Sequence, residues 1–304
     1  MAEEPLVSIV TPSYNMAAFL LETIDSVFSQ GYPRTEYIVM DGGSTDGTVE
    51  ILRRYGNRLR YLAAPDRGAA AINRGCESSH GSIFAWLNAD DRYLPGAVSA
   101  AVRQLMAAPG VAVVYGEAYW VDRRGEILRR YPTESFDPER LSRECYICQP
   151  ACFLRKSAFE RAGMLDPTLQ SAFDYDLWIR MSRNYLFLRL EEHLATSRMY
   201  ASNKTLGRRS QVFAECFRVF KRHYRYVPFQ WIFSYCCFLL DGRDQFFRPL
   251  RPSFSKYILS LPLGCWHNRG QVNRFAREWW SVMTIPAFLR RLSETRMGRS
   301  WPSR

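Results

Sequence analysis

Two adjacent aspartates, Asp90 and Asp91, are the residues whose types and spacing point most clearly to chemistry. They end an apolar run that begins at Ile83 and lies between Gly81 and Pro95. Neighbouring carboxylates repel each other unless a positive group lies between or upon them. Carboxylate oxygens suit Mg²⁺ or Mn²⁺, which proteins commonly hold with one or two carboxylates and substrate phosphates. The pair therefore predicts a metal-bound nucleotide or diphosphate, and the alternative is a turn that the two aspartates cap.

A second pair, Asp174 and Asp176, lies in the aromatic segment 173–178, where an amphipathic helix is expected to begin. A helix needs one N-terminal cap, so capping accounts for only one of the two carboxylates. Two carboxylates beside aromatic side chains offer a general base in a pocket that excludes water. Both residues are therefore candidate catalytic groups, and a capping role stays open for either.

The elements that must position these carboxylates alternate between strands and helices. Strands are expected at 6–11, 37–40, 60–63 and 83–88, and the helices between them at 19–28, up to Tyr55, and at 69–76. This order predicts an α/β fold with a mostly parallel sheet and helices on both faces. Asp41 and the Asp90-Asp91 pair then follow the carboxyl ends of two strands, where open α/β sheets bind their ligands. A strand at 111–115 and an antiparallel hairpin within 117–130 are expected to make the sheet mixed.

Five segments in this order resemble the inverting, nucleotide-sugar-dependent glycosyltransferases of the large bacterial group called family 2, over about residues 6–200. They are Val7-Ser8-Ile9-Val10-Thr11-Pro12-Ser13-Tyr14-Asn15, Met40-Asp41-Gly42-Gly43-Ser44-Thr45-Asp46-Gly47-Thr48, Asp66-Arg67-Gly68 with Asn73-Arg74-Gly75, Asn88-Ala89-Asp90-Asp91, and Asp174-Tyr175-Asp176-Leu177-Trp178. The resemblance implies the GT-A fold, a nucleotide-binding, Rossmann-like mixed sheet flanked by helices.

The resemblance also implies a role for each matched residue. Pro12, Tyr14 and Asp41 would hold the nucleotide base and ribose, and Asp66 to Asn73 would border the same pocket. Asp90 would lie near the ribose, and Asp91 would coordinate Mg²⁺ or Mn²⁺ on the sugar-nucleotide diphosphate. Asp174 would be the catalytic base.

The sequence departs from the family pattern at two positions. Gly42 stands where the family often has a second acid, and Phe173 stands where it often has Glu before the base. The second departure leaves open whether Asp174 or Asp176 takes the proton, and the place in the motif favours Asp174.

The expected reaction is a single displacement with inversion, from a UDP-linked or other nucleotide-diphosphate sugar to an acceptor hydroxyl. A divalent ion neutralises the charge of the leaving diphosphate, and a carboxylate removes the acceptor proton. A nucleotidyltransferase is one rival, but the segment 11–15 lacks the cationic, glycine-rich phosphate loop expected of that class. A catalytically idle polysaccharide-binding protein of the same fold is the other, and the intact acids argue against it.

The charge is divided unevenly along the 304 residues. The chain carries +11, but residues 1–199 carry −3 and residues 200–304 carry +14. We therefore predict a catalytic domain at 1–200 and a basic, aromatic-rich helical extension at 201–304. Its partner is expected to be an anionic membrane surface rather than nucleic acid, because the apolar run 228–240 suits an interface but is too short to span. The alternative is a pair of surface helices with solvated arginines.

The beginning of the chain and the cysteines complete the expectations. The acidic segment 1–5 and the polar residues Pro12, Ser13 and Asn15 are unlike a cleavable signal peptide, which predicts a cytoplasmic protein, peripheral on the inner face of the membrane. A saccharide or lipid-linked saccharide acceptor in envelope polysaccharide or glycolipid synthesis would fit that location. The spacing Cys145-x2-Cys148-x3-Cys152 lacks a matching second ligand pair, so buried thiols are favoured over a metal site.

Overall fold

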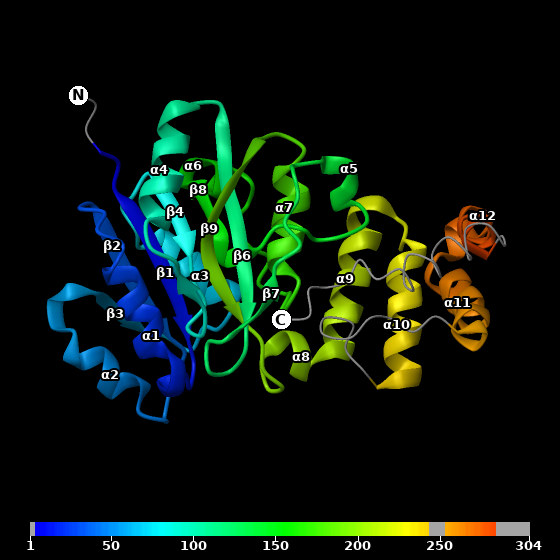
Figure 1. Ribbon diagram of the computed structural model, residues 1–304, viewed down its shortest axis with the longest axis horizontal. Coiled ribbons are helices and arrows are strands. Elements are labelled where there is room, and N and C mark those ends of the chain that lie inside the picture. The colour runs from blue at the N-terminus through cyan, green and yellow to red at the C-terminus, as the bar shows by residue number, and fades with distance from the viewer. Residues whose placement is uncertain (1–3, 243–252, 284–304) are drawn as a thin grey trace. The chain divides into compact units, whose positions relative to one another are not determined.

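The computed structural model describes residues 4–242 and 253–283 (Figure 1). The chain forms two compact units that divide between Glu215 and Cys216. This division lies inside helix α9 (Arg209–Tyr224), whereas the boundary predicted at residue 200 rests on charge alone. The first unit contains the sheet and the candidate site, and the second is helical.

The first half of the sheet is parallel, as its apolar strands predict. Its strands run in the order β3-β2-β1-β4, which places the first strand of the chain between the second and the fourth. Their bounds are β1 (Val7–Ser13), β2 (Thr35–Asp41), β3 (Arg60–Ala63) and β4 (Ile83–Trp86). The helices between them are α1 (Ala17–Phe28), α2 (Thr48–Arg54) and α3 (Ala69–Glu77), with the short η1 (Gly56–Arg58) before β3.

The second half of the sheet is mixed, and this confirms the predicted mixed α/β class. The order continues β8-β6-β9-β5, in which β8 (Cys152–Arg155) runs antiparallel to both β4 and β6 (Val111–Val121). β9 (Leu186–Arg198) is parallel to β6 and antiparallel to β5 (Arg92–Tyr93). The expected hairpin is formed by β6 and β7 (Ile127–Arg130), where Gly125 turns the chain at φ +89°.

Helices cover both faces of the sheet because every central strand buries alternate side chains on opposite sides. Val7 and Ile9 of β1 pack in one core with α1, α2 and α4 (Ala97–Ala107). On the other face, α3 lies so close that a side-chain carbon at Gly75 would come within 2.5 Å of Val10. Farther along that face, Trp86 packs on α6 (Lys156–Arg161) and α7 (Phe173–Met181) through ring contacts.

β1 continues through Pro12, although the sequence predicts that this residue breaks the strand. The carbonyl oxygen of Val10 accepts the last bond on the β4 side, from the N–H of Leu87. Pro12 points to the same side as Val10 but lies beyond that bond, so its missing N–H removes no pairing there. The strand therefore carries Ser13 and the following Tyr14 to the carboxyl edge of the sheet.

The second unit packs the end of α9 with α10 (Phe229–Asp241), α11 (Phe254–His267), η3 (Arg269–Gln271) and α12 (Val272–Met283). Phe233 contacts Tyr257 with ring centroids 4.5 Å apart, and the indole N–H of Trp279 donates to the carbonyl of Tyr257. Among the described helices, none is both long and apolar enough to cross a bilayer.

The apolar run 228–240 packs inside the second unit, whereas its composition predicts a segment at a membrane interface. It forms α10, whose residues Phe229, Ile232, Phe233, Cys236 and Cys237 are buried inside the second unit. Its hydrophobic face is therefore used for packing, because this small unit needs that helix for a core. Only Leu239 and Leu240 at its end are about half exposed, at 50% and 51%.

Candidate active site

Asp90 and Asp91 lie directly beyond β4, at the carboxyl edge of the parallel strands. The backbone N–H of Arg198 donates to Oδ1 of Asp91 at 2.8 Å, and the side-chain amide of Asn88 donates to Oδ2 at 3.0 Å. The hydroxyl of Tyr200 donates to Oδ2 of Asp90 at 2.9 Å. Asp91 is buried and Asp90 half-buried. These bonds orient both carboxylates but bring no positive side chain directly onto them.

The guanidinium of Arg198, at the end of β9, is directed elsewhere. It pairs with Glu22 and donates to the backbone carbonyls of Asp90 and Arg123. Burial and the adjacent carboxylate therefore raise the pKa of Asp91 to about 8, and burial raises the pKa of Asp90. The nearby positive groups are therefore too few to offset the negative charge of these two desolvated carboxylates.

The carboxylate pair fits a divalent cation. No cluster of three or more Asp, Glu, His or Cys side chains suited to a metal is found in the part of the chain that the structure describes. Mg²⁺ and Mn²⁺ do not need such a cage, because they are held by one or two carboxylates while water and substrate phosphates complete the shell. Asp91 and Asp90 are the residues that would hold the ion, and its charge would relieve their repulsion.

Asp41 ends β2 and organises the loop that follows it. Its carboxylate accepts the N–H groups of Gly43 and Ser44 and the hydroxyl of Ser44. The structure also explains the departure at Gly42, because a side-chain carbon there would lie 2.9 Å from Cγ of Arg67. The space that a second acid would fill is occupied by this arginine.

Tyr14 and Arg67 form the exposed part of the predicted nucleotide pocket. The guanidinium carbon of Arg67 lies 3.3 Å from the centroid of the Tyr14 ring, and Tyr14 is 37% exposed. Pro12 lies half-buried two residues before Tyr14. The stacked pair forms a flat, polar-edged platform at the carboxyl edge of β1.

Asp66 and Asn73 bond to protein groups on the same side of the sheet. Asp66 pairs with Arg74 at 2.8 Å. The side-chain amide of Asn73 donates to the carbonyl of Leu165 and accepts its N–H, at 2.8 and 3.0 Å. Asn73 therefore fixes the chain that leads into α7, so its contribution to the predicted pocket is indirect.

The two aspartates of α7 have different surroundings. Asp176 is fully buried, and its Oδ2 accepts a bond from Nε of Arg180 at 2.8 Å. The same guanidinium donates to the carbonyls of Ala162 and Met164, so this pair ties α7 to the preceding loop. Asp174 accepts the N–H of Tyr175, and burial raises its pKa to about 6. A carboxylate with that pKa is suited to take a proton near neutral pH.

Electrostatic effects and close approaches show that the carboxyl edge of the sheet lies near the start of α7. Burial raises the pKa of the Cys148 thiol, and the nearby carboxylates of Asp91 and Asp174 both add to that rise. A side-chain carbon at Gly68 would lie 3.3 Å from Nζ of Lys204 and 4.0 Å from the Phe173 ring. Lys204 in turn interacts electrostatically with Asp90. The acid pair, the Asp66-Arg67-Gly68 segment and the start of α7 therefore border one site.

Sequence reasoning missed the residues that approach this site from the end of the first unit. Tyr200 and Arg198 contact the acid pair from more than 100 positions away in the sequence, and Lys204 begins the short helix α8 (Lys204–Gly207). Gln149, in η2 (Gln149–Ala151), accepts a bond from Asn88 and donates to the carbonyl of Trp86. The signal available was a cluster of polar residues just after a long strand, which has no fixed motif.

The cysteine spacing at 145–152 has a packing role. Cys148 and Cys152 are buried, and Cys145 is half-buried. Burial raises the pKa of the Cys148 and Cys152 thiols, which favours the uncharged form over the thiolate that metals bind.

Comparison with known proteins decides the family. The model of the family "Glycosyl transferase family 2" matches residues 8–163, about half of the chain. The chain belongs to glycosyl transferase family 2. An uncharacterized glycosyltransferase of Rickettsia prowazekii is 31% identical over 215 residues, which are 66% of this chain and 66% of that protein. Chondroitin synthase of Pasteurella multocida is 27% identical over 207 residues, 66% of this chain but 21% of that enzyme.

Solved structures of two other proteins share the fold of this chain. TarS of S. aureus in complex with UDP superposes with a TM-score of 0.61 at 14% identity, over 89% of this chain and 83% of that one. The mannosyltransferase PcManGT of Pyrobaculum calidifontis, solved with GDP-Man and Mn²⁺, gives 0.59 at 16% identity, over 99% and 82%. The fold is therefore the predicted GT-A fold. The identities are low enough that these matches establish the fold alone.

Proposed function

We propose that this protein is an inverting glycosyltransferase that moves a sugar from a nucleotide-diphosphate sugar, with UDP as the expected nucleotide, to an acceptor hydroxyl. The observation that carries the proposal is the poorly compensated Asp90-Asp91 pair at the carboxyl edge of the sheet, with Asp174 bordering the same site. A bound divalent ion would supply positive charge to the leaving diphosphate.

The chain's own residues have separate tasks in this proposal. Tyr14 and Arg67 would receive the nucleotide base on their stacked platform, and the loop held by Asp41 would border the ribose. Asp90 would face the ribose side, and Asp91 would be the main metal ligand. Lys204 would place its ammonium beside the phosphates, because it already lies at Gly68 and interacts with Asp90.

Asp174 would accept the proton of the acceptor hydroxyl as that oxygen attacks the anomeric carbon. The hydroxyl attacks from the side opposite the departing diphosphate, so the anomeric configuration inverts. Asp176 is held by Arg180 inside the protein, and this leaves Asp174 as the better placed base. Positioned proton transfer of this kind contributes typically about 10²- to 10⁴-fold to the rate.

The test is a panel of UDP-, GDP- and dTDP-sugars, assayed for nucleotide-diphosphate release with Mg²⁺ or Mn²⁺. Asp91→Ala is the blank, and Arg124→Ala in the exposed β6–β7 turn is the matched control. We expect release with one donor class, lost in the first variant and kept in the second, and NMR of the product should show the inverted anomer. Binding of a saccharide without release from any donor would instead support the idle polysaccharide-binding protein.

We also propose that the second unit binds an anionic membrane surface, where a lipid-linked acceptor is available. Helix α11 presents its apolar residues outward. Lys256, Tyr257, Ser260 and Gly264 face the interior of the unit. Phe254 and Ile258 are 72% and 49% exposed, and Leu261 and Cys265 continue their stripe at helical spacing. A helix with a polar buried face and an apolar exposed face is suited to lie in a bilayer interface.

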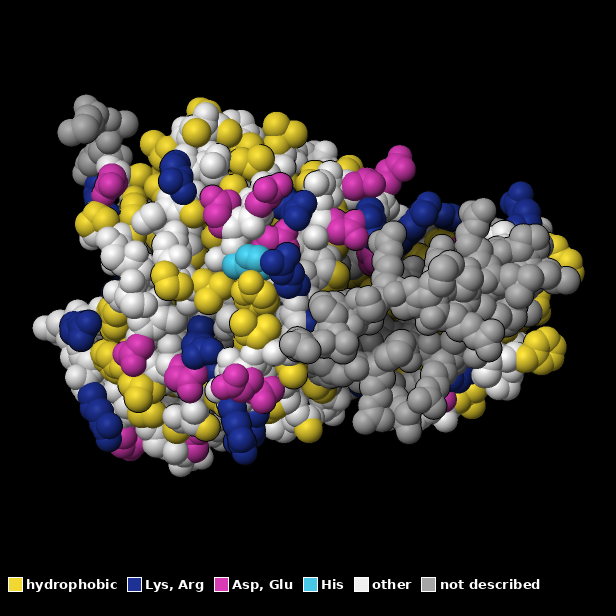
Figure 2. Space-filling view, in the orientation of Figure 1, with side chains coloured by type: hydrophobic (Ala, Val, Ile, Leu, Met, Phe, Trp, Pro, Cys, Tyr) yellow, Lys and Arg dark blue, Asp and Glu magenta, His cyan; other side chains and the backbone are white. Residues whose placement is uncertain are grey.

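Charge and aromatic residues favour a lipid occupant for this stripe. Trp266 and Trp280 are 64% and 67% exposed, and the guanidinium of Arg269 lies 3.6 Å from the centroid of the Trp266 ring. Figure 2 shows exposed hydrophobic side chains on this unit. Residues 216–304 carry 16 Lys and Arg against 4 Asp and Glu, which complements anionic headgroups.

Vesicle sedimentation tests this surface. We expect the protein to bind phosphatidylcholine vesicles that contain phosphatidylglycerol, and to bind less at high salt. The double variant Phe254→Ser/Trp266→Ser should bind at least about tenfold more weakly, because two side chains no longer enter the interface. Leu186→Ser, at a 63% exposed position in the first unit, is the matched control. Unchanged binding by the double variant, or a dimer that replaces vesicle binding, would contradict the proposal.

A further inference from the structure

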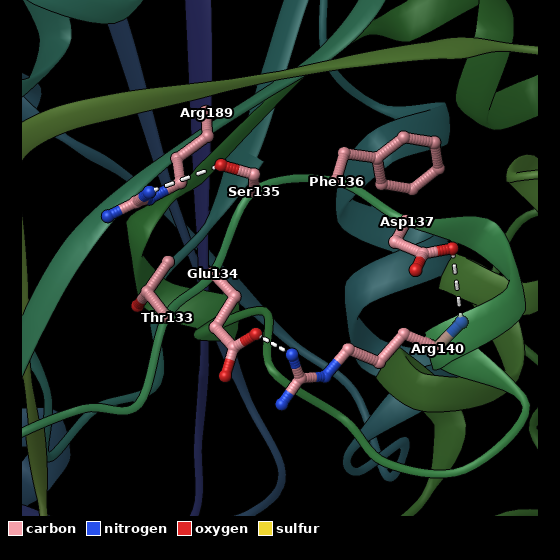
Figure 3. Close-up of a pocket in the computed structure, with 7 residues that line it drawn as sticks. All are labelled: Thr133, Glu134, Ser135, Phe136, Asp137, Arg140 and Arg189. Atoms are coloured by element: carbon pink, nitrogen blue, oxygen red, sulfur yellow. Dashed lines mark hydrogen bonds and ion pairs between the residues drawn. The ribbon is translucent and has the colours of Figure 1, made fainter.

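A second candidate site on the first unit lies beside α7, the helix that carries the proposed base Asp174. Neither Asp90 nor Asp91 lines it. It is a pocket of about 470 Å³ lined by Thr133, Glu134, Ser135, Phe136, Asp137, Arg140 and Arg189 (Figure 3). The loop between β7 and the short helix α5 (Pro138–Leu141) supplies most of the wall, and β9 supplies Arg189. Its volume is within the roughly 300–1,000 Å³ typical of small-molecule pockets.

The loop that forms this pocket begins and ends near the first turn of α7, which carries Asp174. At one end, Tyr131 is half-buried; burial raises the pKa of its hydroxyl, and the nearby carboxylate of Asp174 adds to that rise. At the other end, the hydroxyl of Tyr175 donates to the carbonyl of Leu141. A molecule in the pocket would therefore contact a loop that is tied to the helix of the proposed base.

The pocket's arginines are already paired with carboxylates. Arg189 donates two bonds to Oε1 of Glu117, at 2.8 and 2.5 Å, and one to the hydroxyl of Ser135 at 3.4 Å. Arg140 pairs with Glu134 and, at 2.5 Å, with Glu144. Figure 2 shows such acidic and basic side chains intermixed on the face that carries β6 and β9.

The charges around the pocket disfavour an anionic ligand. Its lining has two carboxylates, Glu134 and Asp137, against the guanidiniums of Arg140 and Arg189. Glu117 and Glu144, which pair with these guanidiniums, add two further negative charges. A carboxylate or phosphate that entered would meet surplus negative charge and would have to displace existing ion pairs.

The remaining groups suit hydroxyls and C–H surfaces. Thr133 and Ser135 can donate and accept hydrogen bonds, and the carboxylates accept them from hydroxyl groups. Phe136 stacks on Phe187 with centroids 4.4 Å apart and planes 2° apart, so its ring is fixed in the pocket wall. A rigid aromatic ring next to polar groups matches the alternating apolar and hydroxyl faces of a sugar.

We propose that this pocket binds an uncharged saccharide unit of the acceptor and selects against acidic saccharides. Because it names the acceptor class of the same active site, this proposal rests on the proposed function. Glu117 is the specificity-determining residue, since its carboxylate occupies the guanidinium of Arg189 that would otherwise attract an anion. Phe136 supplies the apolar contact.

Saturation-transfer NMR on the full chain measures saccharide binding without turnover. The probes are neutral β-linked disaccharides, including cellobiose, and cellobiouronic acid as the matched anionic partner. We expect saturation transfer to a neutral disaccharide and at least about tenfold weaker binding of the acid. Phe136→Ala should abolish the neutral signal, while Arg124→Ala should keep it. Absence of any neutral signal, or preference for the acid, would overturn the proposal.

The variant Glu117→Gln tests the origin of the selectivity. It keeps the shape of the side chain but releases Arg189 from its ion pair, so the preference for cellobiose over cellobiouronic acid should fall to near unity or reverse. An unchanged preference with intact folding would show that Glu117 does not set specificity. If the saccharide binds but no sugar nucleotide is turned over, the proposed function fails and the saccharide site stands. If sugar nucleotide is turned over but no saccharide binds in the pocket, the saccharide site fails and the proposed function stands.

Discussion

The carboxylates at the sheet edge and those around the pocket differ in how their charge is compensated. Asp90 and Asp91 receive hydrogen bonds from Tyr200, Asn88 and a backbone N–H, and their pKa values are raised. Around the pocket, Glu117, Glu134 and Glu144 are each paired with a guanidinium. The first group favours an incoming cation, whereas the second already has its partners.

The same contrast separates the two aspartates of α7. Asp176 has its guanidinium partner inside the protein, and Asp174 is a half-buried carboxylate whose pKa is raised by burial. Poorly compensated carboxylates mark the places where we expect metal and proton chemistry, and paired ones mark structural or recognition roles. Substitutions that remove one carboxylate at a time can break this comparison.

The largest expected effect is on turnover in Asp174→Asn. The amide cannot accept the acceptor proton, so kcat should fall by about 10²- to 10⁴-fold. Thermal unfolding should show no loss of stability, because the variant removes a poorly solvated charge rather than an ion pair. Turnover within a few-fold of the parent chain would place the base elsewhere.

The matched substitution Asp176→Asn should act mainly on stability. It leaves Arg180 without its buried partner, and breaking such a pair costs about 3–5 kcal/mol in the free energy of unfolding. Denaturant unfolding of both variants measures this difference. The comparison is wrong if Asp176→Asn unfolds like the parent chain while its turnover disappears.

A smaller effect should appear in the pH dependence of kcat/KM. The base must be ionised, and burial raises the pKa of Asp174 to about 6. With saturating Mn²⁺, which would keep Asp91 ionised, activity should therefore be constant above that pH and fall about tenfold for each pH unit below it. The acidic limb should be absent from the residual activity of Asp174→Asn, whereas an unchanged limb would assign it to another group.

Much of the fold could be predicted because its signals are local. The apolar strands that lead to Asp41 and Asp90 and the turn at Gly125 each follow from neighbouring residues. The exceptions depend on tertiary position: Pro12 continues β1 because it lies beyond the β4 pairing, and α10 is a packing helix because its face finds a core.

The site was predictable where family motifs exist and not where distant segments complete it. Asp90 and Asp91 stand out in the sequence, but Arg198 ends β9, Tyr200 and Lys204 follow it, and the three have no recognisable spacing. The pocket at 133–140 also escaped prediction, because Arg189 of β9 and its partner Glu117 of β6 reach this loop from distant strands. Such pairings depend on strand register, which the sequence does not state.

The most direct test of the contrast between the two groups of carboxylates is calorimetric titration of Mn²⁺ into the protein with UDP present. Asp91→Asn removes a poorly compensated carboxylate, and Glu134→Gln removes a paired one. We predict one Mn²⁺ per chain for the parent protein and for Glu134→Gln, and at least about tenfold weaker binding for Asp91→Asn. Equal Mn²⁺ affinity in Asp91→Asn and the parent protein would contradict the account.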